Sequence, residues 1–238
     1  MSAAPGNLPK TSVLALVPGL NNTHAVFDRL RATLPNWIDA HALDCPALPA
    51  VEQIAQVLLD VLPERFWLCG FSFGGYVALA MLQAAPERVR GIALVCTGPF
   101  ADTPEQAQKR RASLSAVDEG RYFETIAAQA ANAFHPDSLA DAQLMEERSR
   151  MVQAYGPERY RAHVLATIAR PDRRHLLDGS RPTLVVAASH DKVFAPTVVA
   201  KWAETIPGGR FETIAKAGHL MPMEQPGALA QVLARWIG

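Results

Sequence analysis

The sequence predicts an α/β fold: a mostly parallel central sheet flanked by helices, with an inserted block of helices. Two observations lead to this prediction. Short apolar runs alternate with amphipathic segments over residues 1–100 and again over 178–238, which is the pattern of parallel strands joined by crossover helices. Between them, residues 101–177 contain charged helical patterns and no strand-like run. We therefore expect a core of residues 1–100 and 178–238 and a helical cap or lid of residues 101–177.

The expected strands are mostly short apolar runs that suit burial on both faces of a parallel sheet. They cover residues 12–17, 37–43, 66–70, 91–96, 183–188 and 210–214. Apolar residues at helical spacing predict core helices that begin near Val26, Val51, Gly75, Val198 and Leu229. The helix from Gly75 is apolar on nearly every side, so it is expected to lie buried beneath the sheet.

The cap is expected to hold about four amphipathic helices. They cover residues 104–117, 121–133, 139–155 and 158–169, and turn signals at Gly120, Pro136 and Gly156-Pro157 separate them. The alternative is a set of ordinary crossover helices, but no strand-like segment interrupts this stretch.

Composition excludes several classes of function. The chain has 238 residues, 49% of them hydrophobic, which fits one globular domain. Lys+Arg and Asp+Glu are equal at 23 each, so no global field attracts nucleic acid or an anionic membrane. No apolar run approaches the 18 or so residues of a membrane span, and residues 1–10 lack the apolar core of a signal peptide. Three cysteines, Cys45, Cys69 and Cys96, fit a reducing cytoplasm and no disulfide framework.

Ser72 lies in a G-x-S-x-G motif between the strand 66–70 and the buried helix. This context is typical of a nucleophile elbow, a sharp strand-to-helix turn with the serine at its apex. Gly70 and Gly74 have no Cβ, so the strand and the helix can close around Ser72. The motif alone fits an ordinary glycine-rich loop equally well, so the flanking segments must decide between a loop and a nucleophile elbow.

Two further polar residues stand at comparable places. Asp191 follows the strand 183–188, and His219 follows the strand 210–214. Ligands of an open parallel sheet bind outside the carboxyl ends of its strands. We therefore expect Ser72, Asp191 and His219 to meet there.

The sequence resembles the α/β-hydrolase superfamily over nearly its whole length. It looks most like compact bacterial serine hydrolases with a helical cap, such as the carboxylesterase of biotin synthesis, the MenH type and the meta-cleavage C–C hydrolases. The matching stretches are Val17-Pro18-Gly19-Leu20, Gly70-Phe71-Ser72-Phe73-Gly74-Gly75, Ser189-His190-Asp191-Lys192-Val193 and Ala217-Gly218-His219-Leu220, followed by Glu224-Gln225-Pro226. One departure is Pro18, where the family often has histidine.

The resemblance implies a role for each residue. Ser72 is expected to be the nucleophile, His219 its general base and then acid, and Asp191 the residue that orients His219. The backbone N–H groups of Leu20 and Phe73 are expected to form the oxyanion hole. Some relatives place the acid after the preceding strand, where this chain has Asp102.

A substrate pocket is expected from residues beside these positions: Asn21, Phe100, Phe123, Leu220 and Met221. Each has a structural alternative, since Asn caps helices well and large apolar residues usually pack in the core. His24 lies close enough to the oxyanion loop to reach the pocket, although a helix surface is its alternative place. His163 falls in the cap without metal-like spacing to other histidines.

The expected function is hydrolysis of a small, fairly apolar ester through an acyl-enzyme. The expected partner is a small-molecule ester, with no nucleic acid and no membrane, and the chain is expected to be a monomer or homodimer. No cofactor and no metal are expected. One alternative is a C–C bond hydrolase of a meta-cleavage-type diketone, which needs an arginine for an extra carboxylate. The cap offers several candidates: Arg110, Arg111, Arg148, Arg150, Arg159 and Arg161. A second alternative is a non-catalytic ligand-binding protein on the same fold.

Overall fold

One six-stranded parallel sheet organises the chain. The structure is a computed structural model that describes residues 11–238, so the signal-peptide expectation for residues 1–10 lies outside the described residues. The strand order is β2-β1-β3-β4-β5-β6, and every neighbouring pair is parallel. The strands are β1 (Ser12–Val17), β2 (Ile38–Ala42), β3 (Phe66–Phe71), β4 (Val89–Val95), β5 (Thr183–Ala188) and β6 (Arg210–Ile214). The predicted α/β fold is therefore confirmed.

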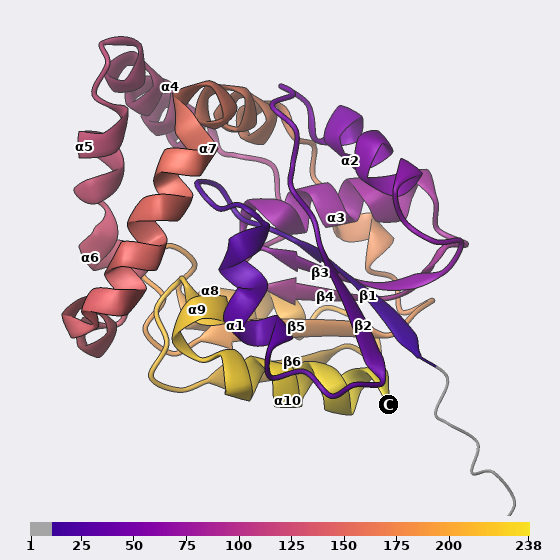
Figure 1. Cartoon of the computed structure of the whole chain (residues 1–238). Coiled ribbons are helices and arrows are strands. Elements are labelled where there is room, and N and C mark those ends of the chain that lie inside the picture. The colour runs from indigo at the N-terminus through magenta and orange to yellow at the C-terminus, as the bar shows by residue number, and fades with distance from the viewer. Residues whose placement is uncertain (1–10) are drawn as a thin grey trace, which may run out of the picture.

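Helices cover both faces of the sheet (Figure 1). One core cluster joins the sheet to α2 (Val51–Asp60), α3 (Phe73–Ala84) and α8 (Pro196–Ala203). A second cluster joins the other face to α1 (Asp28–Arg31), α9 (Met221–Glu224) and α10 (Pro226–Ile237). Ten of the twelve residues of α3 are buried, as its uniformly apolar sequence predicts.

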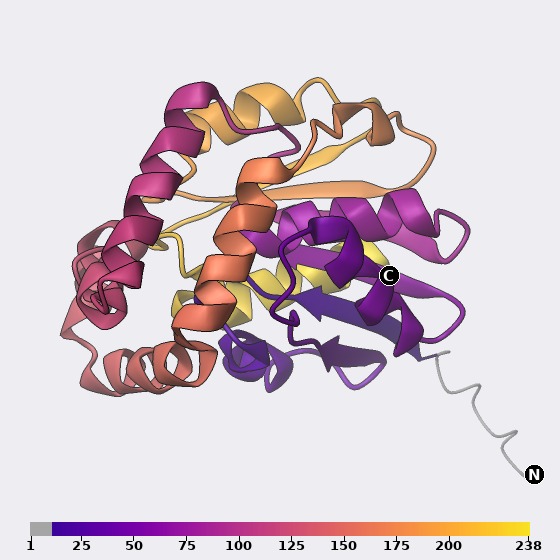
Figure 2. The same ribbon diagram turned by 90° about the horizontal axis from the view of Figure 1, so that it is seen from above.

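The cap helices, by which we mean α4 to α7, lie between β4 and β5 in the sequence. They gather at one end of the sheet, on the left in Figures 1 and 2. Their bounds are α4 (Pro104–Asp118), α5 (Tyr122–Ala127), α6 (Ala130–Ala133) and α7 (Ala142–Ala169), with 3₁₀ turns at Pro136–Ala140 and Arg174–Leu176. Of these, α4, α5 and α7 share a third apolar cluster. The division of the chain into a core and a cap unit stays a prediction. Among the helices of residues 11–238, none is long and apolar enough to cross a bilayer.

Several helix boundaries differ from the sequence prediction. The single helix expected at 121–133 is broken into α5 and α6. By contrast, α7 consists of two helical segments that meet at a kink, as the helices expected at 139–155 and 158–169 predict. Gly156 lies at this kink with the non-helical angles φ 75° and ψ 167°, directly before Pro157. The first expected helix is shorter, with a 3₁₀ turn (His24–Phe27) before α1.

The strand order determines where a ligand can bind. The chain runs from β1 to β2 at the sheet edge and then returns past β1 to β3, so β1 and β3 are neighbours whose following loops lead in opposite directions. The crevice at such a switch point lies outside the carboxyl ends of both strands. The segment 18–22 after β1 and Ser72 after β3 both fall at this point.

Candidate active site

Ser72 occupies a strained turn between β3 and α3. Its φ of 53° and ψ of −118° lie in a region that non-glycine residues rarely adopt. The turn closes because of its glycines. A Cβ on Gly70 would lie 2.5 Å from the Gly74 carbonyl oxygen, and a Cβ on Gly74 would lie 2.1 Å from the Val17 carbonyl oxygen. Both neighbours are backbone atoms, so no side-chain movement can relieve either collision.

Three side chains from three strand ends meet at this turn. His219 Nε2 lies 2.8 Å from Ser72 Oγ, and His219 Nδ1 lies 2.8 Å from Asp191 Oδ2. All three residues are buried or nearly so. A histidine in this position can accept the serine proton at Nε2 while its Nδ1–H donates to the carboxylate. The structure thus brings together the three residues that the sequence analysis selected.

Asp191 is held as a carboxylate. Its Oδ1 accepts hydrogen bonds from the backbone N–H groups of Val193 and Phe194, at 2.7 and 2.9 Å. Burial raises the pKa of Asp191, but the charge and hydrogen bond of His219 and these two N–H groups outweigh it, so the pKa lies below its usual value. The competing residue, Asp102, is buried between Arg110 and Arg170 instead.

The loop that carries His219 is tied to the cap side of the site by Glu224. Glu224 Oε1 accepts from the Gly218 N–H at 3.0 Å, while Oε2 accepts from the His135 N–H and the Ser138 hydroxyl, each at 2.7 Å. Burial raises the pKa of Glu224 in spite of these donors. The sequence showed Glu224 only as part of a matching stretch, because its three partners lie in two segments far apart along the chain.

Two backbone N–H groups point to an oxyanion hole. Leu20 and Phe73 both line the cavity that contains Ser72 and His219. Within residues 11–238, neither N–H donates to a protein acceptor. The Leu20 loop is fixed by Asn22, whose Nδ2 donates to the Leu20 carbonyl oxygen at 2.8 Å, and by Asn21 in a left-handed conformation (φ 59°). Two free N–H donors beside a serine hydroxyl can stabilise an oxyanion that develops there.

The catalytic cavity has a volume of about 420 Å³, within the range of small-molecule sites. Of the five expected pocket residues, Asn21 and Leu220 line it. Asn21 also accepts a hydrogen bond from the Tyr122 hydroxyl at its side-chain oxygen. Residues that the sequence analysis did not select also line it, among them Tyr76, Arg148, Tyr160, Thr167 and Phe194.

The other three expected pocket residues do not line the catalytic cavity. Phe100 packs edge-on against Trp202, with ring centroids 6.2 Å apart. Met221 is fully buried in the core, since it follows Leu220 into α9. Phe123 is 53% exposed and lines a neighbouring cavity, because Tyr122 takes the buried side of α5. His24 is exposed and pairs with Asp44, away from the site.

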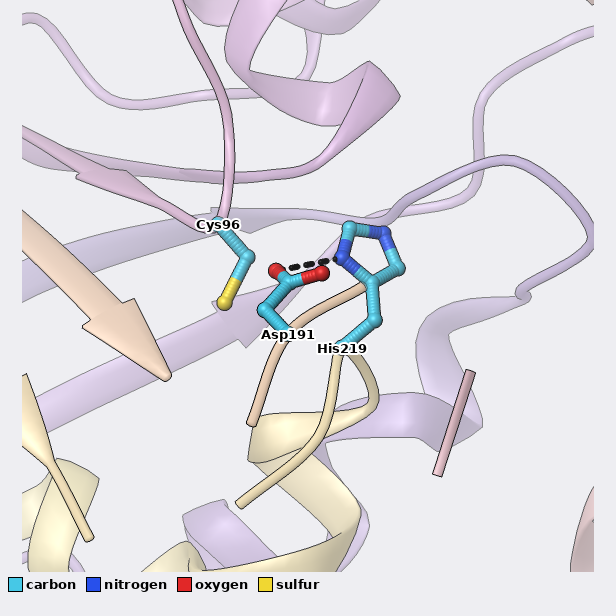
Figure 3. Close-up of side chains that lie close together, drawn as sticks. All are labelled: Cys96, Asp191 and His219. Carbon is cyan, nitrogen blue, oxygen red and sulfur yellow. Dashed lines mark hydrogen bonds and ion pairs between the residues drawn. The ribbon is translucent and has the colours of Figure 1, made fainter. Parts of the chain in front are cut away.

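The buried Cys96 lies beside Asp191, on the side away from His219, as Figure 3 shows. Ligand atoms of Cys96, Asp191 and His219 lie within 4.8 Å of one another, a spacing that a metal ion could use. Metal binding would require the thiolate and would compete with the His219–Asp191 hydrogen bond. Burial and the neighbouring Asp191 raise the pKa of Cys96 well above its usual value. The arrangement therefore favours a neutral thiol packed beneath the Asp191 carboxylate.

His163 contacts Phe73, the residue that follows Ser72. Its ring stacks on Phe73, with centroids 4.7 Å apart, and its Nε2–H donates to the Pro46 carbonyl oxygen at 2.7 Å. Nδ1 then accepts from the Tyr155 hydroxyl. Burial lowers the pKa of His163 to about 4. The sequence does not reveal this contact, because Pro46 and His163 are far apart along the chain.

This depressed pKa predicts a pH-dependent stability. The unfolded chain binds the His163 proton below about pH 6.5, whereas the folded chain resists it until about pH 4. Stability is therefore lost as the pH falls through this window, by up to about 3 kcal/mol from this residue. Urea unfolding at pH 7 and pH 4.5 measures the loss. His163→Gln should lose distinctly less stability than the wild type between the two pH values, and an equal loss would contradict this assignment.

Known proteins that are similar to this chain are hydrolases, which agrees with the geometry of the site. Residues 41–226 match the family described as alpha/beta hydrolase fold. The chain is 26% identical over 230 residues to a pimeloyl-[acyl-carrier protein] methyl ester esterase of Nitrosomonas europaea, covering 87% of this chain and 88% of that protein. It is 27% identical to a putative carbamate hydrolase RutD of Azorhizobium caulinodans, covering 78% of this chain and 71% of that protein. A solved thermophilic esterase of Thermogutta terrifontis superimposes with a TM-score of 0.86 at 27% identity, covering 95% of this chain and 89% of the other.

Proposed function

The chain belongs to the α/β-hydrolase fold family, and we propose that it is a serine hydrolase that cleaves a small, fairly apolar ester through an acyl-enzyme. One observation supports this most directly: the continuous hydrogen-bonded series from Ser72 Oγ through His219 to Asp191. A binding protein would have no need of a buried nucleophile, base and acid in this order.

The first half of the reaction would acylate Ser72. As Ser72 Oγ attacks the ester carbonyl carbon, its proton passes to His219 Nε2. The negative charge that develops on the carbonyl oxygen would be stabilised by the N–H groups of Leu20 and Phe73, a contribution of about 3–4 kcal/mol per donor. The C–O bond of the ester then breaks, and His219 gives its proton to the departing alcohol. Asp191 stabilises the imidazolium in between.

The second half would release the acid. A water molecule takes the place of the alcohol and attacks the acyl carbonyl carbon, while His219 Nε2 accepts one of its protons. The bond from the acyl carbon to Ser72 Oγ breaks, and the proton returns to Ser72. The products are one carboxylic acid and one alcohol, and the enzyme is unchanged.

The relatives bear on the kind of ester. Two of the similar proteins are called an esterase of a methyl ester and an esterase. A methyl ester places a minimal alcohol at the nucleophile, so the acyl part would fill most of the catalytic cavity. We propose a carboxylic ester with a small alcohol as the substrate class. The C–C bond hydrolase remains a second candidate, because Arg148 lies in the cavity wall where that reaction needs a cation.

Covalent trapping tests this proposal. A fluorophosphonate probe should label the folded protein at Ser72, located by mass spectrometry of the tryptic peptide. p-Nitrophenyl butyrate should release a burst of p-nitrophenol of about one equivalent per active site if deacylation is slow. Protein unfolded in urea is the control and should not label. A folded protein that neither labels at Ser72 nor hydrolyses the ester would refute a serine hydrolase.

A further inference from the structure

Arg148 of α7 stands in the wall between two cavities. One is the catalytic cavity of about 420 Å³, and the other is a cavity of about 400 Å³ enclosed by α5, α6 and α7. Gln129, Ala133 and Arg148 line both. The second cavity is otherwise lined mainly by apolar side chains, including Phe123, Ile126, Phe134, Met145 and Val152. Arg148 is therefore a cation at the junction of a polar reaction site and an apolar chamber.

Arg148 differs in its partners from Arg110, the other arginine that lines the catalytic cavity. Its Nη1 donates to the Asn21 carbonyl oxygen and, at 2.8 Å, to Asn22 Oδ1. By contrast, Asp102 pairs with both Arg110 and Arg170, and Glu147 pairs with Arg29. Among residues 11–238, no carboxylate lies within ion-pair distance of Arg148. Burial lowers the pKa of Arg148 to about 10, so it still carries its charge at neutral pH.

The free donors of the Arg148 guanidinium indicate which kind of ligand group it could bind. Only Nη1 has protein partners in the described part of the chain, so Nε–H and the Nη2–H groups are left without acceptors. These two nitrogens form one edge of the planar fork, and such an edge binds a carboxylate through two parallel hydrogen bonds. Asn21 and Asn22 hold the opposite edge, which fixes the orientation of the fork without neutralising its charge.

We propose that Arg148 is a specificity-determining residue that binds a carboxylate of the substrate. The preferred substrates are then half-esters of dicarboxylic acids, with the ester at Ser72 and the free carboxylate at the Nε/Nη2 edge of Arg148. This inference rests on the proposed function, since it needs an ester at Ser72. Arg148 is half-buried and has no counter-ion among residues 11–238, so a substrate carboxylate could bind its free edge through charge-assisted hydrogen bonds.

A paired set of substrates tests the proposal. One series is the monomethyl esters of dicarboxylic acids of four to eight carbons, and the other is the methyl esters of monocarboxylic acids of equal length. The readout is the ratio of kcat/KM between the charged and the neutral ester. The wild type should favour the charged ester at one or more lengths. Arg148→Gln should lower this ratio by about 10- to 100-fold, since it removes two charge-assisted hydrogen bonds.

Control variants separate charge recognition from other effects. Arg150, on the same helix, is 66% exposed and pairs with Glu146, so Arg150→Gln should leave the ratio unchanged. Arg110, which is paired with Asp102, and Lys192 are further cations that line the catalytic cavity. Lys192→Gln should lower the ratio much less than Arg148→Gln. Arg148→Lys keeps the charge but loses the fork, so its ratio should fall between wild type and Arg148→Gln.

The outcomes distinguish this inference from the proposed function. If Arg148→Gln lowers both esters equally, Arg148 acts only by holding Asn21 and Asn22, and the inference is wrong. It is equally wrong if the wild type prefers the neutral esters at every length. If no ester is hydrolysed at all, the proposed function is wrong. Carboxylate binding at Arg148 can then still be measured by titration calorimetry. Adipate should bind the wild type, and its Kd should rise about tenfold or more in Arg148→Gln but not in Arg150→Gln.

Discussion

Replacing Ser72 with alanine should lower kcat for ester hydrolysis by roughly 10⁶-fold, the scale on which removing the nucleophile disables a catalytic triad. The Ser72 side chain makes one hydrogen bond, to His219, so the substitution removes the nucleophile and leaves the other side-chain contacts of the turn in place. The Gly70 and Gly74 contacts that allow the turn are unchanged. The measurement is steady-state hydrolysis of p-nitrophenyl butyrate, with the melting temperature followed in parallel.

Ser189→Ala is the matched control for this experiment. Ser189 follows β5 just as Ser72 follows β3, but its hydroxyl contacts His190 and not His219. Its replacement should leave kcat close to that of wild type. A Ser72→Ala protein that keeps more than about one hundredth of the wild-type kcat would show that another group attacks the ester, because the oxyanion hole and binding alone retain far less.

The meeting of the three candidate triad residues could be predicted from the sequence because each one lies in the loop that follows a strand. The direction of a parallel sheet places all such positions at one edge, so adjacency along the chain is enough to bring Ser72, Asp191 and His219 near each other. The strand-to-helix turn at Ser72 could also be predicted from the sequence, because a Cβ at Gly70 or Gly74 would collide with backbone atoms. Both inferences depend on local geometry and on the sheet, and neither depends on how the cap packs.

The substrate pocket could not be predicted in the same way. Its cap-side wall comes from α4, α6 and α7, whose rotation is set by packing among the cap helices and against the core. One step along α5 separates buried Tyr122 from exposed Phe123, and the sequence gives no sign of which of them faces inward. Six cap arginines looked alike in the sequence. Arg148 is distinguished by its place in the wall between two cavities and by its contacts with the distant residues Asn21 and Asn22.

Glu224 and His163 were missed for a related reason. Each is a buried polar residue whose partners come from segments far apart along the chain: Gly218, His135 and Ser138 for Glu224, and Pro46 and Tyr155 for His163. A buried polar side chain needs its hydrogen bonds satisfied. The residue type alone does not show whether it will be buried.

Replacing Asp191 with asparagine should lower kcat by about 10⁴-fold, through the orientation and protonation of His219. The carboxylate accepts from His219 Nδ1–H, so Nε2 is free to accept the Ser72 proton. An asparagine that keeps its oxygen toward Val193 and Phe194 turns its NH₂ group toward His219 Nδ1. The ring must then accept at Nδ1 and carry its proton at Nε2, which is the wrong tautomer for a base. The loss should appear in kcat for the p-nitrophenyl ester.

Asp102→Asn provides the opposite pattern and decides between the two candidate acids. Asp102 pairs with Arg110 and Arg170 at 2.7 and 2.8 Å and makes no contact with His219. Removing its charge leaves two arginines without their buried partner, which should cost about 3 kcal/mol of stability. Its kcat should stay close to that of wild type. The wild-type Asp191 carboxylate faces His219, so Asp191→Asn should lose far more activity than any change in its melting temperature would explain. If instead Asp102→Asn causes the larger loss of kcat, Asp191 is not the residue that orients His219.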